Sequence, residues 1–264
     1  MKRRDFLKTT AGLGAAAALS KVLSNLPENT ALAGQSEKGG NAPVLPKRAY
    51  GKTGVKLSII GMGGHVMIGA EQKHANKVVA KAIEKGVNYF DVSPLYGAGD
   101  AEQKLGPALE PYRKKAFLAC KTVQHERKGA QTELKTSLKR LRTDYLDLYQ
   151  LHGLTDLKKD VDVVFAKGGA MEVFIEAKKT GRVRHLGFSA HTVEAAMASM
   201  DRYDFDSVLF PINFACYYGG NFGKQVIEKA QQKKAAVLAI KALARRALAC
   251  QTPTMAQGVC QVRV

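Results

Sequence analysis

Short apolar segments alternate with amphipathic segments along most of this chain, and this alternation limits the possible folds more than any other feature. Each apolar run has the length of a buried strand, and the segments between them carry apolar residues at helical spacing. The pattern predicts strands over residues 57–64, 87–93, 115–122, 145–153, 183–189, 206–214 and 235–243. It predicts helices over residues 71–86, 100–110, 131–142, 169–181, 192–200 and 222–234. Regular alternation with short connections indicates an α/β protein with a parallel sheet.

The predicted strands are nearly continuous apolar runs, which is typical of strands that are covered on both faces. A chain of 264 residues is long enough for one large barrel or for two ordinary domains. Because the alternation continues without a change in composition, we expect a (β/α)8 TIM-type barrel rather than an open sheet. The sequence contains about seven such strands, so the barrel is expected to be incomplete.

The N-terminal segment predicts an export signal. Arg3 and Arg4, followed by the letters DFLK, resemble the twin-arginine motif. An Ala/Gly-rich stretch comes next, and the residues Ala31, Leu32 and Ala33 suit signal cleavage. The apolar stretch is too short for a membrane-spanning helix. We therefore expect a signal peptide over residues 1–33, the twin-arginine export machinery as a partner, a periplasmic or extracytoplasmic location, and no stable membrane span.

The net charge and the cysteine content indicate whether the protein binds nucleic acid or metal ions. A formal net charge of +18 indicates either a polyanion-binding surface or a well-solvated basic surface. Lysines are scattered through the predicted helices and are not gathered with aromatic residues, which favours the solvated surface, so we expect no nucleic-acid partner. The four cysteines show no CxxC spacing, and we expect no metal site.

Several predicted strands end in side chains with useful chemistry. Asp91 ends the second strand, Lys121 lies on the third, His152 on the fourth and Ser189 on the fifth. Tyr96 follows Asp91 in a loop bounded by glycine. In parallel barrels the chemistry takes place at the carboxyl ends of the strands, so we expect these side chains to meet at one mouth.

A phenol beside an ammonium group is a plausible proton donor. The ordinary phenol pKa is about 10, and a nearby positive charge stabilises the phenolate. We expect Lys121 to lower the pKa of Tyr96, Asp91 to hold Lys121 charged, and His152 to bind a substrate oxygen or to relay protons. Such a donor suits a carbonyl oxygen, with a nicotinamide cofactor as the hydride source. Each residue taken singly has an equally good structural explanation; their occurrence on consecutive strand ends favours the functional one.

The segment GVNYFDVSPLYGAGDAEQKLGPAL resembles the signature of the aldo/keto reductase family. The segments LACKT, DLYQLHG and KKTGRVRHLGFSAH continue the resemblance, which extends over residues 47–245. It implies a barrel that binds NADP(H), with NAD(H) as the alternative, and that reduces an aldehyde or ketone or oxidises the corresponding alcohol. It also implies that Tyr96 is the general acid, that Lys121 and Asp91 tune it, and that His152 positions the carbonyl.

The same resemblance implies a set of cofactor-binding residues. Gly63 matches a glycine near the nicotinamide ribose, and Ser189 matches the serine that binds the carboxamide. Asn213 is the amide nearest to the glutamine expected on the sixth strand, and Lys241 is placed to approach the pyrophosphate. Departures from the family pattern occur at Ala190 and Ile240, where asparagine and a stacking tyrosine are common. The predicted cofactor-binding residues are Gly63, Asp91, Ser189, Asn213 and Lys241.

The ends of the barrel region differ from the rest of the chain. Residues 34–46 are rich in Gly and Pro and predict a linker. Residues 246–264 show no family motif and no acidic residue, although a complete barrel needs an eighth strand there. We expect a chain that is truncated or frame-shifted near residue 245, with a divergent tail as the alternative. Two other functions stay open: a nucleotide-binding scaffold barrel with impaired catalysis, and a polyanion-binding protein.

Overall fold

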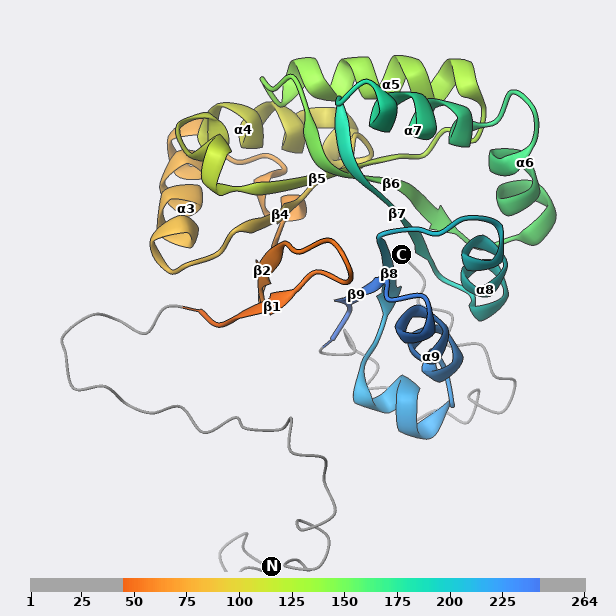
Figure 1. Ribbon diagram of the computed structural model, residues 1–264. Coiled ribbons are helices and arrows are strands. Elements are labelled where there is room, and N and C mark those ends of the chain that lie inside the picture. The colour runs from red at the N-terminus through yellow and green to blue at the C-terminus, as the bar shows by residue number, and fades with distance from the viewer. Residues whose placement is uncertain (1–44, 243–264) are drawn as a thin grey trace, which may run out of the picture. The chain divides into compact units, whose positions relative to one another are not determined.

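A computed structural model describes residues 45–242 of the chain. The expected signal peptide (1–33), most of the expected linker (34–46) and the expected tail (246–264) lie outside the described residues, as does the expected truncation point at residue 245. The described residues form a two-stranded antiparallel hairpin and a seven-stranded parallel sheet whose strands follow one another in chain order. The sheet curls, and its helices cover the outer face (Figure 1).

The bounds of the strands agree closely with the apolar runs of the sequence, except at the first run. The hairpin consists of β1 (Lys47–Ala49) and β2 (Lys56–Ser58). The parallel sheet consists of β3 (Met62–Gly63), β4 (Tyr89–Asp91), β5 (Phe117–Thr122), β6 (Leu146–Leu154), β7 (Val183–Ala190), β8 (Ser207–Pro211) and β9 (Ala236–Ile240). Within the described part of the chain, β3 and β9 are the edge strands. The predicted α/β class is confirmed, and the curled sheet corresponds to an incomplete (β/α)8 barrel.

Helices connect successive strands, as expected for parallel pairing. They are α3 (Gln72–Glu84), α4 (Asp100–Leu109), α5 (Arg127–Arg140), α6 (Asp162–Phe165), α7 (Ala170–Lys179), α8 (Val193–Arg202) and α9 (Lys224–Gln232). The short helix α6 was missed by the sequence pattern. Thr192 caps α8 by accepting a hydrogen bond from the N–H of Ala195, which explains where that helix begins.

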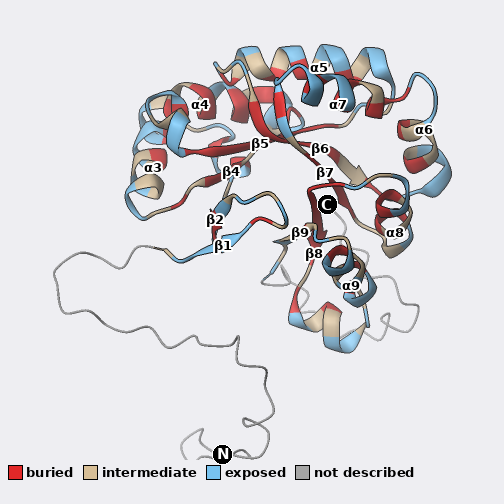
Figure 2. Cartoon of the chain, viewed as in Figure 1, coloured by how far each residue is buried: buried red, intermediate tan, exposed pale blue. Residues whose placement is uncertain are grey.

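Alternate residues of each strand face two different cores. Phe90, Leu118 and Tyr149 pack outward in the large cluster between sheet and helices. Tyr89 and Phe117 point inward and belong to a smaller cluster on the concave side. Burial on both faces makes β5 to β8 almost entirely buried, and Figure 2 shows these strands mostly in red on the inner side of paler helices. Because successive side chains of a strand point to opposite faces, every second residue of a strand lies on the concave side of the sheet.

The prediction of one strand over residues 57–64 is wrong. The run is divided between β2 and β3, and Ile59 and Ile60 between them are exposed. At the last residue of β2, the N–H of Ser58 donates a hydrogen bond to Asn88 Oδ1 at 2.7 Å. Gly61 then passes so close to the ring of Tyr89 that a Cβ atom would lie 2.2 Å from it. Because Ile59 and Ile60 are apolar, the hydrophobic pattern predicted one continuous strand across this turn.

The hairpin covers the concave side of the sheet near the amino ends of the strands. Tyr50, just after β1, is buried, and its hydroxyl donates to Ser207 Oγ on β8 at 2.7 Å. Its ring contacts Phe117 and His185 edge-on, with centroids 5.1 and 5.6 Å apart. Tyr50 thereby links the hairpin to β5, β7 and β8, which are far apart in sequence.

We predict that Tyr50→Phe lowers the free energy of unfolding by about 1–2 kcal/mol, because the buried Ser207 hydroxyl loses its partner while the ring contacts stay. Urea unfolding followed by circular dichroism measures the change. Tyr112→Phe, at a half-buried tyrosine of the turn before β5, is the matched control. Equal unfolding midpoints for the Tyr50→Phe variant and the unmodified protein would contradict the prediction.

Candidate active site

Asp91, Lys121 and His152 all lie on the inner face of the sheet, on the adjacent strands β4, β5 and β6. Parallel pairing brings their carboxyl ends to one side, so the three side chains meet as the sequence predicted. Tyr96 begins the turn that follows β4. The structure thus gathers all four residues predicted to carry the chemistry.

Lys121 and Asp91 form a buried ion pair. The Lys121 side chain is only 1% exposed, and its Nζ contacts Asp91 Oδ1 and donates to the carbonyl of Val92 at 3.2 Å. Burial alone would lower the pKa of Lys121, but the negative charge of Asp91 and the neighbouring Tyr96 outweigh it and raise that pKa. The ammonium group is therefore charged at neutral pH.

The second oxygen of Asp91 is held by two residues that the sequence analysis missed. The Tyr89 hydroxyl donates to Asp91 Oδ2 at 2.8 Å, and Gln150 Nε2 donates to the same oxygen at 3.0 Å. Tyr89 is two residues before Asp91, and Gln150 is two residues before His152. The period of two along a strand was the signal that could have found them, since it places each pair on one face.

Tyr96 lies beside the ammonium group in a tightly turned loop. Lys121 Nζ is 5.2 Å from the centroid of the Tyr96 ring. The three residues that follow the tyrosine adopt left-handed backbone conformations, with φ of 61° at Gly97, 52° at Ala98 and 94° at Gly99. Glycine adopts this conformation without a steric penalty, which explains the two glycines of the motif.

The expected lowering of the phenol pKa is wrong for the protein without ligands. Burial raises the pKa of Tyr96 above its ordinary value and outweighs the positive charge and the hydrogen bond of Lys121, which act in the predicted direction. The phenol therefore keeps its proton at neutral pH. A protonated phenol with an ammonium group beside it is arranged to donate that proton and to have the resulting phenolate stabilised.

His152 is neutral at pH 7. Burial, followed by the positive charge of Lys121, lowers its pKa to about 4. Its Nδ1 is 3.0 Å from the hydroxyl of Ser93, a fully buried residue that the sequence analysis also missed. The Ser93 oxygen also accepts a hydrogen bond from the N–H of Leu95 at 3.3 Å. When Ser93 donates to Nδ1, the neutral imidazole carries its proton on Nε2.

A second imidazole packs on the phenol ring. His65, in the turn η1 (Gly64–Met67) after β3, lies with its ring centroid 4.0 Å from that of Tyr96 and tilted by 33°. His152 approaches the same ring edge-on, at 5.9 Å and 85°. His65 is close to the phenol only because β3 pairs with β4, so nothing in its local sequence revealed the contact.

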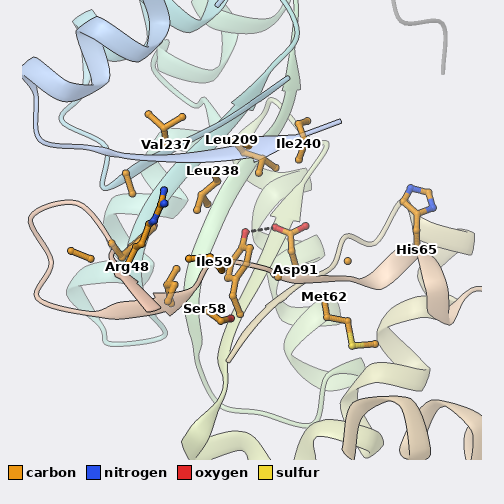
Figure 3. Close-up of a pocket in the computed structure, with 18 of the residues that line it drawn as sticks. Arg48, Ser58, Ile59, Met62, His65, Asp91, Leu209, Val237, Leu238 and Ile240 are labelled. Atoms are coloured by element: carbon orange, nitrogen blue, oxygen red, sulfur yellow. Dashed lines mark hydrogen bonds between the residues drawn. The ribbon is translucent and has the colours of Figure 1, made fainter. Parts of the chain in front are cut away.

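A cavity of about 520 Å³ opens onto this cluster and is lined by Asp91, Tyr96 and His65 at one end. It extends between the hairpin and β3 on one side and β8 and β9 on the other. In Figure 3, Asp91 and His65 are drawn on one side of the view and Arg48 on the other, with apolar side chains of β8 and β9 between them. The size is within the usual range for small-molecule sites, about 300–1,000 Å³.

The predicted cofactor-binding residues lie at the carboxyl ends of the strands. They differ in the space around them and in the hydrogen bonds that they already make. Gly63 lines the cavity, and a Cβ atom there would meet nothing within 4 Å. The Ser189 hydroxyl accepts a hydrogen bond from the N–H of Gly153 at 2.7 Å, and Asn213 Oδ1 accepts one from the N–H of Cys216 at 2.9 Å. Lys241 follows β9 in a left-handed conformation, with φ of 57°.

Two further findings concern residues 45–242 alone. No helix of this region is long and apolar enough to cross a membrane. The same region contains no group of three or more His, Cys, Asp or Glu side chains arranged to hold a metal ion.

A curled parallel sheet that gathers a phenol, an ammonium–carboxylate pair and a neutral imidazole at the carboxyl ends of its strands defines an α/β protein of the barrel type with a polar site at one end of its sheet. The profile of the aldo/keto reductase family matches residues 60–255, and the profile of the twin-arginine translocation signal matches residues 1–20. The chain therefore belongs to the aldo/keto reductase family and begins with a twin-arginine signal sequence.

Individual relatives agree with this assignment. An uncharacterized oxidoreductase of Bacillus subtilis strain 168 (YqkF) is 33% identical over 158 residues, which cover 55% of this chain and 49% of the relative. An aldo-keto reductase of Schizosaccharomyces pombe whose name includes NADP(+) is 31% identical over 176 residues, 58% of this chain and 49% of the relative. The chain thus spans about half the length of these relatives.

The fold also matches a solved structure. The holo form of an aldo-keto reductase from Bacillus halodurans superposes with a TM-score of 0.66 at 25% identity. The match covers 79% of this chain and 70% of that protein.

We predict that His152 makes the protein less stable as the pH falls from 6.5 to 4. In this interval an unfolded histidine binds a proton, whereas the folded His152, with a pKa of about 4, does not. Its contribution to the free energy of unfolding is present above pH 6.5 and is lost on acidification. Urea unfolding across this interval should therefore show a flatter pH dependence for His152→Gln than for the unmodified protein.

His74→Gln, at an exposed histidine of α3, is the control for this measurement and should keep the full pH dependence. An unchanged slope in the His152→Gln variant would show that His152 is not held neutral by its surroundings.

Proposed function

We propose that this protein is an NADP(H)-dependent oxidoreductase that reduces an aldehyde or ketone, or oxidises the corresponding alcohol, with Tyr96 as the general acid. The observation that carries the proposal is the buried Lys121–Asp91 pair beside the Tyr96 ring, with neutral His152 edge-on to the same ring. The NADP(+) in the name of the S. pombe relative supports the choice of cofactor.

The residues present fit a nicotinamide cofactor. The cavity combines an open approach at Gly63 with apolar walls at Met62 and Ile240, against which a flat ring can pack. Asn213 uses its oxygen within the protein, which leaves its Nδ2 group to donate to a carboxamide. We propose that Gly63, Asp91, Ser189, Asn213 and Lys241 hold the cofactor. Lys241 supplies positive charge near His191, consistent with an anionic group at this place.

The chemistry follows from the protonation states of the site. The cofactor, when bound, supplies the hydride that the carbonyl carbon accepts. His152 Nε2 donates a hydrogen bond to the carbonyl oxygen and orients it. Tyr96 transfers its proton to that oxygen as negative charge develops on it, which gives the alcohol and leaves a phenolate. Lys121, held charged by Asp91, stabilises this phenolate. Oxidation of an alcohol uses the same groups in reverse.

We predict that Tyr96→Phe lowers kcat for carbonyl reduction by about 10²- to 10⁴-fold, the usual contribution of a general acid. The cofactor's affinity should be retained, because the substitution removes only the hydroxyl group. Initial rates with NADPH and a panel of aliphatic, aromatic and hydroxylated aldehydes test the first point, and quenching of protein fluorescence by NADPH tests the second. Tyr112→Phe is the control.

Turnover that survives in the Tyr96→Phe variant would contradict the role of Tyr96. Cofactor binding by the unmodified protein without turnover of any carbonyl would instead favour the nucleotide-binding scaffold.

We also propose that the twin-arginine signal directs the protein to the periplasm or beyond, and that residues 34–46 link it to the barrel region. Replacing Arg3 and Arg4 together by lysine should leave full-length, uncleaved protein in the cytoplasm, as cell fractionation and immunoblotting would show. The same replacement at Arg245 and Arg246, the other adjacent arginine pair of the chain, is the control and should not affect export. Unchanged export of the Arg3/Arg4 variant would contradict the proposal.

A further inference from the structure

The positive charge of the connecting segments is concentrated at the amino ends of the strands. The hairpin (residues 47–58) and the six connections that enter β4 to β9 carry twelve Lys or Arg and four Asp or Glu. These connections are residues 85–88, 110–116, 141–145, 180–182, 203–206 and 233–235. The segments that leave the carboxyl ends of β3 to β9 carry only four Lys or Arg and five Asp or Glu. They are residues 64–71, 92–99, 123–126, 155–169, 191–192, 212–223 and 241–242.

The hairpin and these six connections form one surface. The basic residues are scattered along the sequence because a strand and a helix separate successive connections, but the fold brings them to one end of the sheet. The N–H of Lys52 donates to the carbonyl oxygen of Lys234 at 3.1 Å, and Asn88 Nδ2 donates to the carbonyl oxygen of Lys56 at 2.9 Å. The hairpin thereby contacts the connections before β9 and β4. We call the hairpin and the six connections the basic face.

Much of the charge on the basic face is not neutralised by the protein. Five of its lysines are exposed and form no ion pair within residues 45–242: Lys47, Lys56, Lys114, Lys115 and Lys234. Twelve cations share four carboxylates on this face. Because like charges repel one another, a face of this kind is stabilised when an external anion covers it.

Two large aliphatic side chains are exposed on the same face. Ile59 and Ile60, 48% and 57% exposed, follow the hairpin and stand just before the amino end of β3. The N–H of Ile59 donates to the carbonyl oxygen of Pro46 at 3.0 Å, which places the two isoleucines beside Lys47. Adjacent exposed isoleucines next to unpaired cations indicate a surface that binds a partner with both apolar and anionic groups.

The aromatic residues of the basic face are not available to stack on a ligand. The Tyr145 ring is covered by Arg113 and Arg184, whose guanidinium carbons lie 4.0 and 4.1 Å from its centroid. Tyr112 and Tyr203 pack against the main core. Proteins that bind single-stranded nucleic acid stack its bases on aromatic side chains, and this face offers exposed aliphatic ones in their place.

We propose that the basic face binds the surface of an anionic phospholipid bilayer, with its cations at the headgroup phosphates and Ile59 and Ile60 in the interfacial layer. Attraction to anionic lipids and burial of apolar area together hold proteins on such surfaces, without a membrane-spanning helix. Tyr96 lies at the opposite ends of the strands, so the proposed active site faces away from the bilayer. The export proposed above would deliver the protein to a compartment bounded by a membrane.

The test measures co-sedimentation of the full chain with vesicles. Vesicles of equimolar phosphatidylglycerol and phosphatidylcholine are compared with vesicles of phosphatidylcholine alone, at low ionic strength. We expect binding to the anionic vesicles to be at least about tenfold tighter, on the order of two cations at the surface. Binding should be released by about 0.5 M NaCl, because salt screens exposed charges.

Two pairs of adjacent lysines show whether the basic face is responsible. Lys114→Gln with Lys115→Gln should weaken binding to the anionic vesicles by about ten- to thirtyfold, since each cation near an anionic surface contributes about fivefold. Lys158→Gln with Lys159→Gln, at two exposed lysines between β6 and α7, removes the same charge from the opposite end of the strands and should change binding little. The signal segment is the same in every variant and does not account for a difference between them.

The aliphatic contribution is tested separately. Ile60→Asn should weaken binding to the anionic vesicles by about three- to tenfold, because it removes apolar area from the interface. Ile175→Asn, at a 51% exposed isoleucine on α7, is the matched control and should bind as the unmodified protein does. Circular dichroism and urea unfolding verify that each variant keeps its fold.

Equal binding to both kinds of vesicle, or equal losses in the two lysine variants, would overturn the proposal. Full vesicle affinity in the Ile60→Asn variant, together with equally tight binding to heparin, would identify a general polyanion surface and would likewise rule out the bilayer as the specific partner. Carbonyl reduction is measured independently of these results, because the exchanged residues lie outside the proposed active site.

Discussion

The ion pair of Lys121 and Asp91 is the interaction on which the rest of the site depends. A fully buried ammonium group is costly unless an opposite charge and hydrogen bonds surround it. Asp91 supplies the charge, the carbonyl of Val92 accepts a hydrogen bond, and Tyr89 and Gln150 hold the second carboxylate oxygen. These groups come from β4, β5, β6 and the residues next to them, so the pair is satisfied only when the three strands adopt their observed register. The same register places the charged Lys121 Nζ beside the Tyr96 ring.

Burial acts on Tyr96 and His152 in opposite directions, and both results suit proton donation. It raises the pKa of Tyr96, so the phenol keeps its proton, and it lowers the pKa of His152 to about 4, so the imidazole is neutral. Lys121 alone stays charged, because Asp91 outweighs the cost of burial. The site therefore combines a protonated acid, a neutral hydrogen-bond donor and one fixed positive charge. In the proposed reaction the ammonium group need not lower the phenol pKa below its ordinary value, because its part is to stabilise the phenolate after the proton has left.

Most of the fold was predictable, because strands buried on both faces and helices buried on one produce different hydrophobic periods. The failure at residues 57–64 has a physical cause: Ile59 and Ile60 are apolar but exposed, and the last residue of β2 is held by Asn88, thirty residues away. The hairpin was missed for a similar reason, since Tyr50 finds its partners on β5, β7 and β8. In the site, Asp91, Tyr96, Lys121 and His152 were recognisable from their position after apolar runs. Ser93 and His65 were not, because their roles depend on contacts across strands. Tyr89 and Gln150 were missed although the period of two places each on the same strand face as Asp91 or His152.

The amino-acid sequence alone was sufficient to predict the α/β class, the succession of strands, the export signal and the four side chains at the strand ends. Each of these depends only on local hydrophobic periodicity or on a short motif. The tertiary structure decided which other side chains join them, since pairing of β3 with β4 brings His65 onto the Tyr96 ring. It also settled the protonation of the phenol and the imidazole. Protonation and hydrogen bonding depend on burial and on neighbours from distant segments, and these exist only once the strands have assembled.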